Sequence, residues 1–143
     1  MKASNEDGSI LPLTLVYGIL SLVLILVVVA ATSLYVERKR LFSLADGASL
    51  VGAEAFELDQ VRVDGDALRA SLQPAAVGEA VGAYLADNPI GHFEGLRVVN
   101  ASTADGQSAT VTLAAYWRPP VLSLFVPDGF PLQVTSVARS VFY

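Results

Sequence analysis

Residues 10–34 read ILPLTLVYGILSLVLILVVVAATSL, and this stretch decides the class of the protein. No charged residue occurs from position 8 to position 36. A helix that crosses the roughly 30 Å hydrocarbon core of a bilayer needs about 20 predominantly apolar residues. Backbone polar groups in lipid must be paired within the segment, so the stretch should be helical. The sequence therefore predicts a small membrane-anchored protein with an N-terminal tail (1–9), a transmembrane helix (10–35) and an outer α+β domain (36–143).

A cleaved secretory signal is the first alternative to a retained anchor. Such a signal has a basic start and an apolar stretch of only 7–15 residues. Here Lys2 is offset by Glu6 and Asp7, and the apolar run is longer, although Val29-Ala30-Ala31 would serve as a weak cleavage site. We favour a helix that stays in the membrane.

Composition excludes several classes of function. The chain has a net charge of -5, and three of its cations, Arg38, Lys39 and Arg40, sit together beside the predicted anchor. The outer domain is therefore acidic, which argues against a nucleic-acid partner. Disulfides and thiolate chemistry are excluded because there is no cysteine. With one histidine, His92, and no phosphate-binding loop or nucleophile elbow, we expect no enzyme, no catalytic residue, no cofactor and no metal site.

The helical pattern continues beyond the predicted membrane surface. Apolar or small residues recur at helical spacing from Leu41 to Phe56, and no Pro or Gly interrupts residues 37–40. We expect one helix from about Pro12 to Phe56, roughly 65 Å long, with a juxtamembrane part over 36–57. Small residues such as Gly52 allow close approach of another element. We favour cover by the chain's own C-terminal domain over an intermolecular seam, and the small face remains a candidate for self-association.

The remaining sequence predicts a small sheet and a second helix. Residues 59–73 read as a short strand or loop, with a helical turn over Ala67–Leu72. Pro74 opens a helix that Asn88-Pro89 ends. Beyond it the apolar period changes to two, and Asp105-Gly106 is a hairpin turn signal. We expect a helix over 74–88 and strands near 95–101, 108–118 and 131–142, packed as an antiparallel sheet on the helices.

Aromatic residues gather in the last part of the chain, which ends in Val141-Phe142-Tyr143. Core filling is the simplest explanation, but an apolar terminus also suits a strand locked into the sheet or a surface that meets a partner. The candidates for partner contact are Ala45, Asp46, Ala48, Gly52, Tyr116, Trp117, Phe142 and Tyr143.

The order of these features resembles a known family. A polar start ending in Gly8-Ser9 leads into the aliphatic helix, a basic juxtamembrane stretch (35–41) follows, and then comes LADGASLVGA over residues 44–53. The chain resembles the TadE/TadG-like proteins of bacterial tight-adherence (Flp-type) pilus systems, whose juxtamembrane helix carries a similar Ala-Asp-rich pattern. The strand Val134–Arg139 is similar to the closing strand of that family.

The resemblance implies a pseudopilin-like or anchoring component whose C-terminal domain is extracytoplasmic. Processed pilin-type leaders carry a glutamate five residues after the cut, and Leu13 stands at that position here. The chain is therefore closer to the uncleaved TadG type. The cations of Arg38–Arg40 favour the opposite orientation to the one that the resemblance implies, because the positive-inside rule would place the domain in the cytoplasm.

We therefore expect a single-pass inner-membrane protein with an extracytoplasmic domain. It would act by contacts with pilus-assembly or secretion-system proteins, and the lipid bilayer would be its other partner. A membrane-tethered binding module for a ligand or cell-wall component is the alternative.

Overall fold

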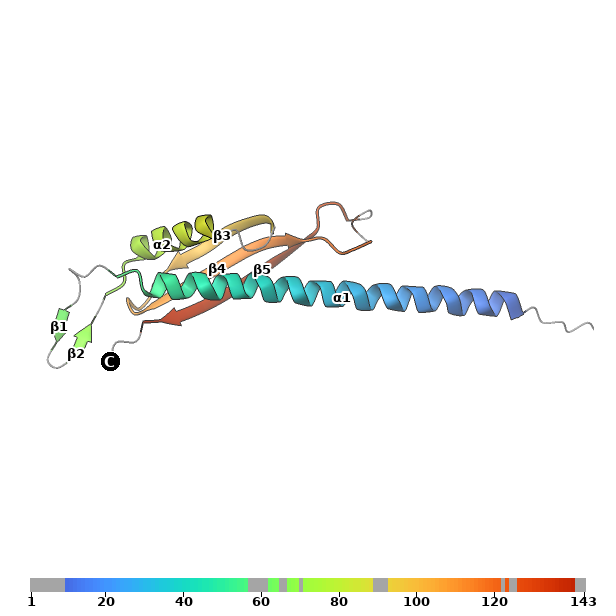
Figure 1. The fold of residues 1–143 in the computed structure, drawn as a ribbon, viewed down its shortest axis with the longest axis horizontal. Coiled ribbons are helices and arrows are strands. Elements are labelled where there is room, and N and C mark those ends of the chain that lie inside the picture. Colours follow the sequence, from blue (N-terminus) through green and yellow to red (C-terminus); the bar gives the residue numbers. More distant parts are fainter. Residues whose placement is uncertain are drawn as a thin grey trace, which may run out of the picture.

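A single long helix runs through the molecule. The computed structural model describes residues 10–56, 62–64, 67–69, 71–88, 93–121, 123 and 126–140. Helix α1 spans Ile10–Ala53, 44 residues in all, so it is about 65 Å long at 1.5 Å per residue. Figure 1 shows α1 extending far beyond the rest of the fold toward its N-terminal end. The predicted single helix through the juxtamembrane stretch is present.

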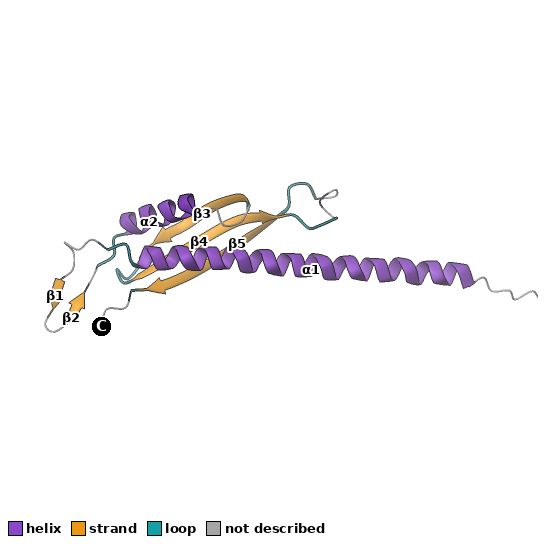
Figure 2. Ribbon diagram, in the orientation of Figure 1, coloured by secondary structure: helices purple, strands orange, loops and turns teal. Residues whose placement is uncertain are grey.

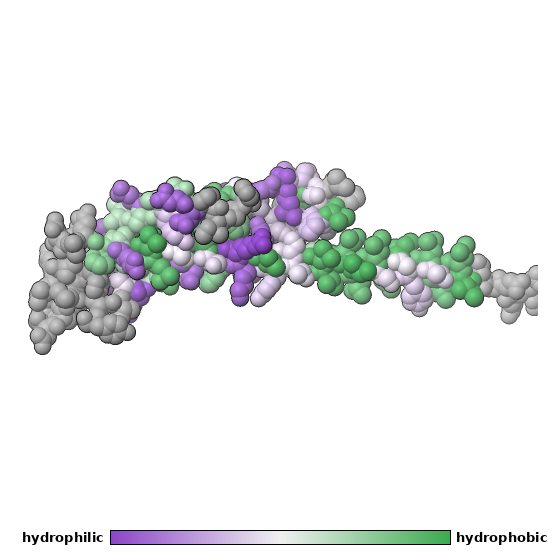
Figure 3. Space-filling model, in the orientation of Figure 1, coloured by the Kyte–Doolittle hydropathy of each residue, from purple (hydrophilic) through white to green (hydrophobic). Residues whose placement is uncertain are grey.

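Helix α1 divides at Leu41 into two parts of unequal length that have different surroundings, and we call Ile10–Arg40 its uncovered half and the shorter Leu41–Ala53 its covered half. From Ile10 to Arg40 no described side chain is buried, whereas Leu41 is fully buried and begins the covered part. Within the first half, the hydroxyls of Thr14, Ser21 and Thr32 donate to the carbonyl oxygens four residues earlier, at 3.0, 2.8 and 2.9 Å. These bonds satisfy polar groups that would otherwise face the apolar surroundings. By length and composition α1 is a candidate membrane span, and Figure 3 shows its apolar N-terminal half standing free of the domain.

Three strands form an antiparallel sheet in the order β3-β4-β5. They are β3 (Glu94–Ser102), β4 (Ser108–Trp117) and β5 (Phe130–Arg139). The central strand β4 pairs with β5 without a break from Ser108 opposite Arg139 to Trp117 opposite Phe130. Its pairing with β3 has register shifts on either side of Arg97-Val98. Figure 2 shows α1 crossing one face of this sheet.

Helix α2 (Pro74–Asp87) packs on the same face of the sheet as α1. Pro74 stands at the first helical position, where its missing N–H costs no intrahelical bond. The helix ends at Asn88, whose backbone N–H and side-chain amide both donate to the carbonyl of Tyr84, at 3.0 and 3.1 Å. Helix α2 packs against both α1 and β3.

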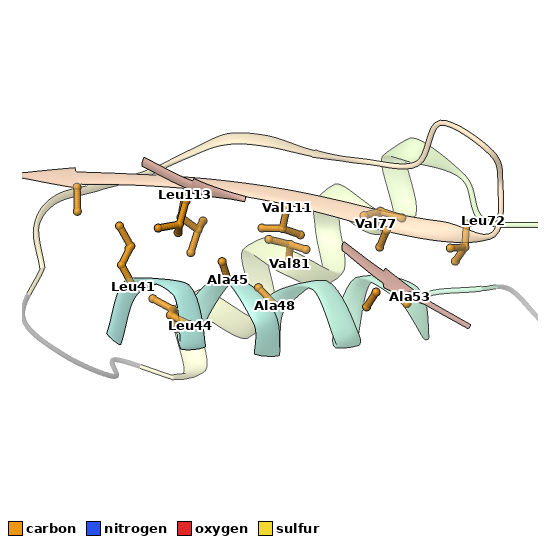
Figure 4. Packing of buried hydrophobic residues seen from close by; sticks show 14 residues of the cluster. Leu41, Leu44, Ala45, Ala48, Ala53, Leu72, Val77, Val81, Val111 and Leu113 are labelled. Atoms are coloured by element: carbon orange, nitrogen blue, oxygen red, sulfur yellow. The ribbon is translucent and has the colours of Figure 1, made fainter. Parts of the chain in front are cut away.

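The core lies between α1, α2 and the inner face of the sheet (Figure 4). Strand β5 alternates buried residues with exposed ones over Val134–Arg139, as a half-buried strand should, whereas the central strand β4 is buried without a break from Val111 to Ala115. The α1 residues that are buried in this core repeat at helical spacing. The core side chains are Leu41, Leu44, Ala45, Ala48, Ala53, Leu72, Val77, Val81, Ala109, Val111, Leu113, Ala115, Val134 and Ala138.

A small two-stranded ribbon precedes α2. Strand β1 (Arg62–Asp64) pairs antiparallel with β2 (Ala67–Arg69). The predicted helical turn beginning at Ala67 is therefore wrong, because residues 67–69 are paired as a strand. Residues 67–69 are extended because their backbone pairs with residues 62–64. The spacing of apolar residues over 67–72 is too short to indicate this pairing. The predicted fold class is confirmed: a long apolar N-terminal helix, a second helix and a three-stranded antiparallel sheet make an α+β fold.

Candidate interaction surfaces

The small residues of α1 contact the chain's own domain. Ala45, Ala48 and Gly52 are buried. A Cβ added at Gly52 would lie 3.2 Å from both the Ala109 Cβ and a Val77 methyl, and 3.3 Å from a Val81 methyl. Glycine therefore lets α1 approach β4 and α2 at one point. These three residues are unavailable to another protein while this packing persists.

Asp46 joins α1 to strand β5. The Ser136 hydroxyl donates to Oδ1 of Asp46 at 3.0 Å, across 90 residues of sequence. The neighbouring Ser49 hydroxyl donates to the Asp46 carbonyl oxygen at 2.8 Å and lies 3.3 Å from the Ser136 hydroxyl. Ser49 and Ser136 are buried, so these bonds satisfy hydroxyls that water does not reach. Asp46 itself remains exposed, so it combines a structural role with access from outside.

Two larger apolar side chains lie exposed on the covered half of α1. Phe42 and Leu50 lie four residues to either side of Asp46, and both are about half exposed. We call Phe42, Asp46 and Leu50 the outer flank of α1. Phe42 and Leu50 were not among the contact candidates predicted from the sequence, because spacing alone does not say which face of a helix its own domain covers. The signal in the sequence that could have indicated their exposure is their large size, because the residues of this segment that are buried are mostly smaller.

Trp117 ends β4 beside α1. Its indole N–H donates to the Ser33 hydroxyl at 3.2 Å, and its ring centroid lies 6.1 Å from that of Phe130 on β5. Trp117 is nearly buried, whereas Phe130 is exposed. Trp117, one of the contact candidates predicted from the sequence, therefore holds the end of the sheet against the apolar half of α1.

Tyr116 is exposed and comes from the opposite face of β4. Gly95, at φ +59°, lies close to the edge of its ring, since an added Cβ would be 2.8 Å from Cδ2 of Tyr116. Of the other candidates, Phe142 and Tyr143 lie outside the described residues, as does His92.

The turn between β3 and β4 is built on Asp105. Its Oδ1 accepts the backbone N–H groups of Gln107 at 2.9 Å and Ser108 at 2.6 Å, and its Oδ2 accepts the Ser108 hydroxyl at 2.9 Å. Bonds to the charged form, first that from Gln107, lower the pKa of Asp105 from 3.8 to about 2. Gly106 supplies the positive φ, +68°, that this turn requires. Asp105 has a structural role here.

Chemistry by a bound metal gains no support from the part of the chain that the structure describes. No group of three or more His, Cys, Asp or Glu side chains there could hold a metal ion. The exposed features are apolar and aromatic side chains beside a candidate membrane span. These features indicate the class of the protein: an α+β domain built on a helix that, among the described residues, is also the candidate transmembrane span.

A family model supports a more specific assignment. Residues 8–55 match the family described as "Putative Flp pilus-assembly TadE/G-like". The resemblance to TadE/TadG-like proteins is thereby confirmed for this segment, which contains the whole of α1 and none of the sheet. No curated protein and no solved structure matches the chain significantly.

Proposed function

We propose that the chain is a single-pass inner-membrane protein that acts by protein–protein contacts in the assembly of an Flp-type pilus or a related secretion apparatus. The observation that carries the proposal is the match over residues 8–55. It includes both the candidate span and the helical segment on which the outer domain is built. One rigid element would then connect the bilayer to the domain.

The outer flank of α1 supports a role in protein contact. Phe42 and Leu50 expose apolar surface on the element that the family match includes. Exposed apolar side chains grouped on one surface are typical of contact sites. Of the candidates selected from sequence, Asp46 and Tyr116 are accessible, and we propose them as contact residues together with Phe42 and Leu50.

Site-specific photo-crosslinking tests the contact surface. A photoreactive residue at Leu50, which is 53% exposed, is compared with one at Val99, which is 50% exposed on β3. We expect the label at Leu50 to capture a membrane or extracytoplasmic protein of the pilus-assembly machinery, identified by mass spectrometry, and the label at Val99 to capture none. Equal yields at the two positions would contradict a contact role for the outer flank. Binding of a cell-wall fragment by the purified chain would favour the tethered binding module instead.

Cysteine labelling tests the extracytoplasmic placement. The chain has no cysteine, so Val137→Cys introduces the only thiol, at an exposed position of β5. We expect a membrane-impermeant maleimide to react with this thiol in spheroplasts before lysis. Reaction only after lysis would place the domain in the cytoplasm, as the cations of Arg38–Arg40 favour.

A further inference from the structure

The end of the sheet lies level with the apolar half of α1. The hydrogen bond from Trp117 to Ser33 places the last residue of β4 beside a helical position four residues before Glu37. Four residues correspond to about 6 Å along a helix. The headgroup region adds roughly 5–7 Å on each side of the hydrocarbon core. With Glu37 as the first charge beyond the span, Ser33 and Trp117 lie within that interfacial depth.

The side chains at this level suit an interface between lipid and water. Tyr35 of α1 is exposed, and Phe130, packed beside Trp117, is 47% exposed. Trp and Tyr concentrate at this depth of a bilayer because one part of each ring system is apolar and the other can form hydrogen bonds. The aromatic side chains therefore match the position that the bond to Ser33 gives them.

Val121 adds an apolar side chain four residues after Trp117 along the chain. It lies in the connection between β4 and β5, with φ 71°, a conformation in which Gly or Asn is usual. Its side chain is nevertheless 55% exposed. No charged residue occurs between Arg118 and Asp128. In Figure 1 this connection projects beyond the sheet toward the N-terminal half of α1.

We infer that this end of the domain, formed by Tyr35, Trp117, Val121 and Phe130, rests in the lipid interface of the leaflet from which α1 emerges. The inference rests on the proposed membrane anchor, and it adds a second point of lipid contact that the anchor does not require. Lipid is the fitting occupant because the surface is continuous with the candidate span. Contact at two points would fix the tilt of the domain, and with it the direction in which the outer flank of α1 faces.

Trp117 is the only tryptophan, so the unmodified protein reports on this surface. The full chain is reconstituted into phosphatidylcholine vesicles whose lipids carry bromine, either near the headgroup end or near the methyl end of the acyl chains. We expect a loss of Trp117 fluorescence with bromine near the headgroups and a smaller loss with bromine at the chain ends. Fluorescence that neither lipid reduces would overturn the inference.

A fluorophore sensitive to polarity, attached at Val121→Cys, tests the connection itself. Val23→Cys in the apolar half of α1 is the lipid standard, and Val137→Cys is the water standard, since both side chains are exposed. We expect the emission at position 121 to shift toward that at position 23 and to be quenched by a spin-labelled lipid.

The three positions separate failure of the inference from failure of the anchor. Emission at position 121 that equals position 137, with position 23 still in lipid, would overturn the inference alone. A shifted emission at 121 that spin-labelled lipid does not quench would show cover by protein, and would also overturn it. Emission at 23 equal to that at 137 would overturn the anchor and the inference together.

Discussion

The two halves of α1 have the same secondary structure but opposite relations to the rest of the chain. The half from Ile10 to Arg40 has large aliphatic side chains, none of which is buried, and it meets the domain at Ser33, which accepts the bond from Trp117. The half from Leu41 to Ala53 has small residues packed under a sheet and a second helix. Large apolar residues suit a helix whose surroundings are fluid lipid, whereas small residues suit a helix that must approach fixed neighbours.

Two glycines illustrate this difference. An added Cβ at Gly18 would meet nothing within 4 Å, whereas at Gly52 it would meet three side chains at 3.2–3.3 Å. The backbone around both is helical, so intrinsic propensity acts on them similarly. Packing on the domain separates them. Substitutions made in matched pairs, one in each half, therefore test the division of α1.

Charge in the uncovered half should have the largest effect. The double substitution of Leu22→Arg and Leu24→Arg should make membrane insertion less favourable by roughly 5–7 kcal/mol, at about 2.5–3.5 for each arginine. The matched double substitution of Phe42→Arg and Leu50→Arg, at exposed positions in the covered half, should leave the protein in the membrane. Extraction of membranes with alkaline carbonate measures both. Retention of the first variant in the membrane would contradict a lipid environment for residues 10–36.

Truncation of a leucine should destabilise the domain when it is made in the covered half of α1 and not when it is made in the uncovered half. Leu41 is 0% exposed in the core and Leu24 is 63% exposed. Leu41→Ala should lower the free energy of unfolding of the domain by about 2–5 kcal/mol, because it leaves a cavity. Leu24→Ala should change it by less than about 0.5 kcal/mol. Urea unfolding in detergent micelles, followed by Trp117 fluorescence, measures both values. Equal effects would mean that the two halves are not differently packed.

Added volume at the two glycines sharpens the same comparison. Gly52→Val should destabilise the domain by about 1–3 kcal/mol, since the branched side chain has no space between Val77, Val81 and Ala109. Gly18→Val should leave domain unfolding unchanged. The same unfolding assay measures both variants. A stable Gly52→Val variant would show that α1 does not approach β4 and α2 as closely as described.

Loss of the Asp46 carboxylate should have a moderate effect on the covered half. Asp46→Ala removes the acceptor for the buried Ser136 hydroxyl, at a cost of about 1 kcal/mol. Asp46→Asn keeps an acceptor oxygen and should recover most of that stability. Thr32→Ala, which removes a hydroxyl from the uncovered half, should not change domain unfolding. If Asp46→Ala unfolds like the wild type, the contact with Ser136 contributes nothing to stability.

The pH dependence of the hairpin should be the smallest effect. The pKa of Asp105 is lowered from 3.8 to about 2 in the folded protein. A group with a lowered folded-state pKa contributes stability above its ordinary value and loses that contribution as pH falls through the folded-state value. The contribution of Asp105 should therefore be complete above about pH 4 and decline toward pH 2. Asp105→Asn should remove this part of the decline in urea midpoint, and an unchanged decline would contradict the role given to the carboxylate.

The fold follows from sequence wherever periodicity and turn chemistry are local. The spacing from Leu41 to Ala53 indicates a helix with one buried face, and Asp105-Gly106 indicates the hairpin between β3 and β4. A short strand or loop was predicted for the region that includes Arg62–Asp64, but the second strand of the ribbon, Ala67–Arg69, was not predicted, because three residues are too few to establish a period.

The candidate site was less predictable, because its contacts join distant segments. The bond from Ser136 to Asp46 spans 90 residues and that from Trp117 to Ser33 spans 84. Neither pair has a spacing that a sequence pattern can reveal. Exposure of Phe42 and Leu50 likewise depends on which face of α1 the sheet covers, and that is settled only when β4 and β5 are in place.

The most direct test of the central claim compares two thiols on α1. The full chain carrying either Leu24→Cys or Leu50→Cys is reconstituted into lipid nanodiscs, which leave both membrane faces open, and reacted with a membrane-impermeant maleimide. Both positions are exposed in the isolated chain. We predict that the thiol at 50 reacts rapidly and that the thiol at 24 is protected by lipid. Equal reaction rates at the two positions would contradict a helix that is anchored in the bilayer over one half and builds the domain with the other.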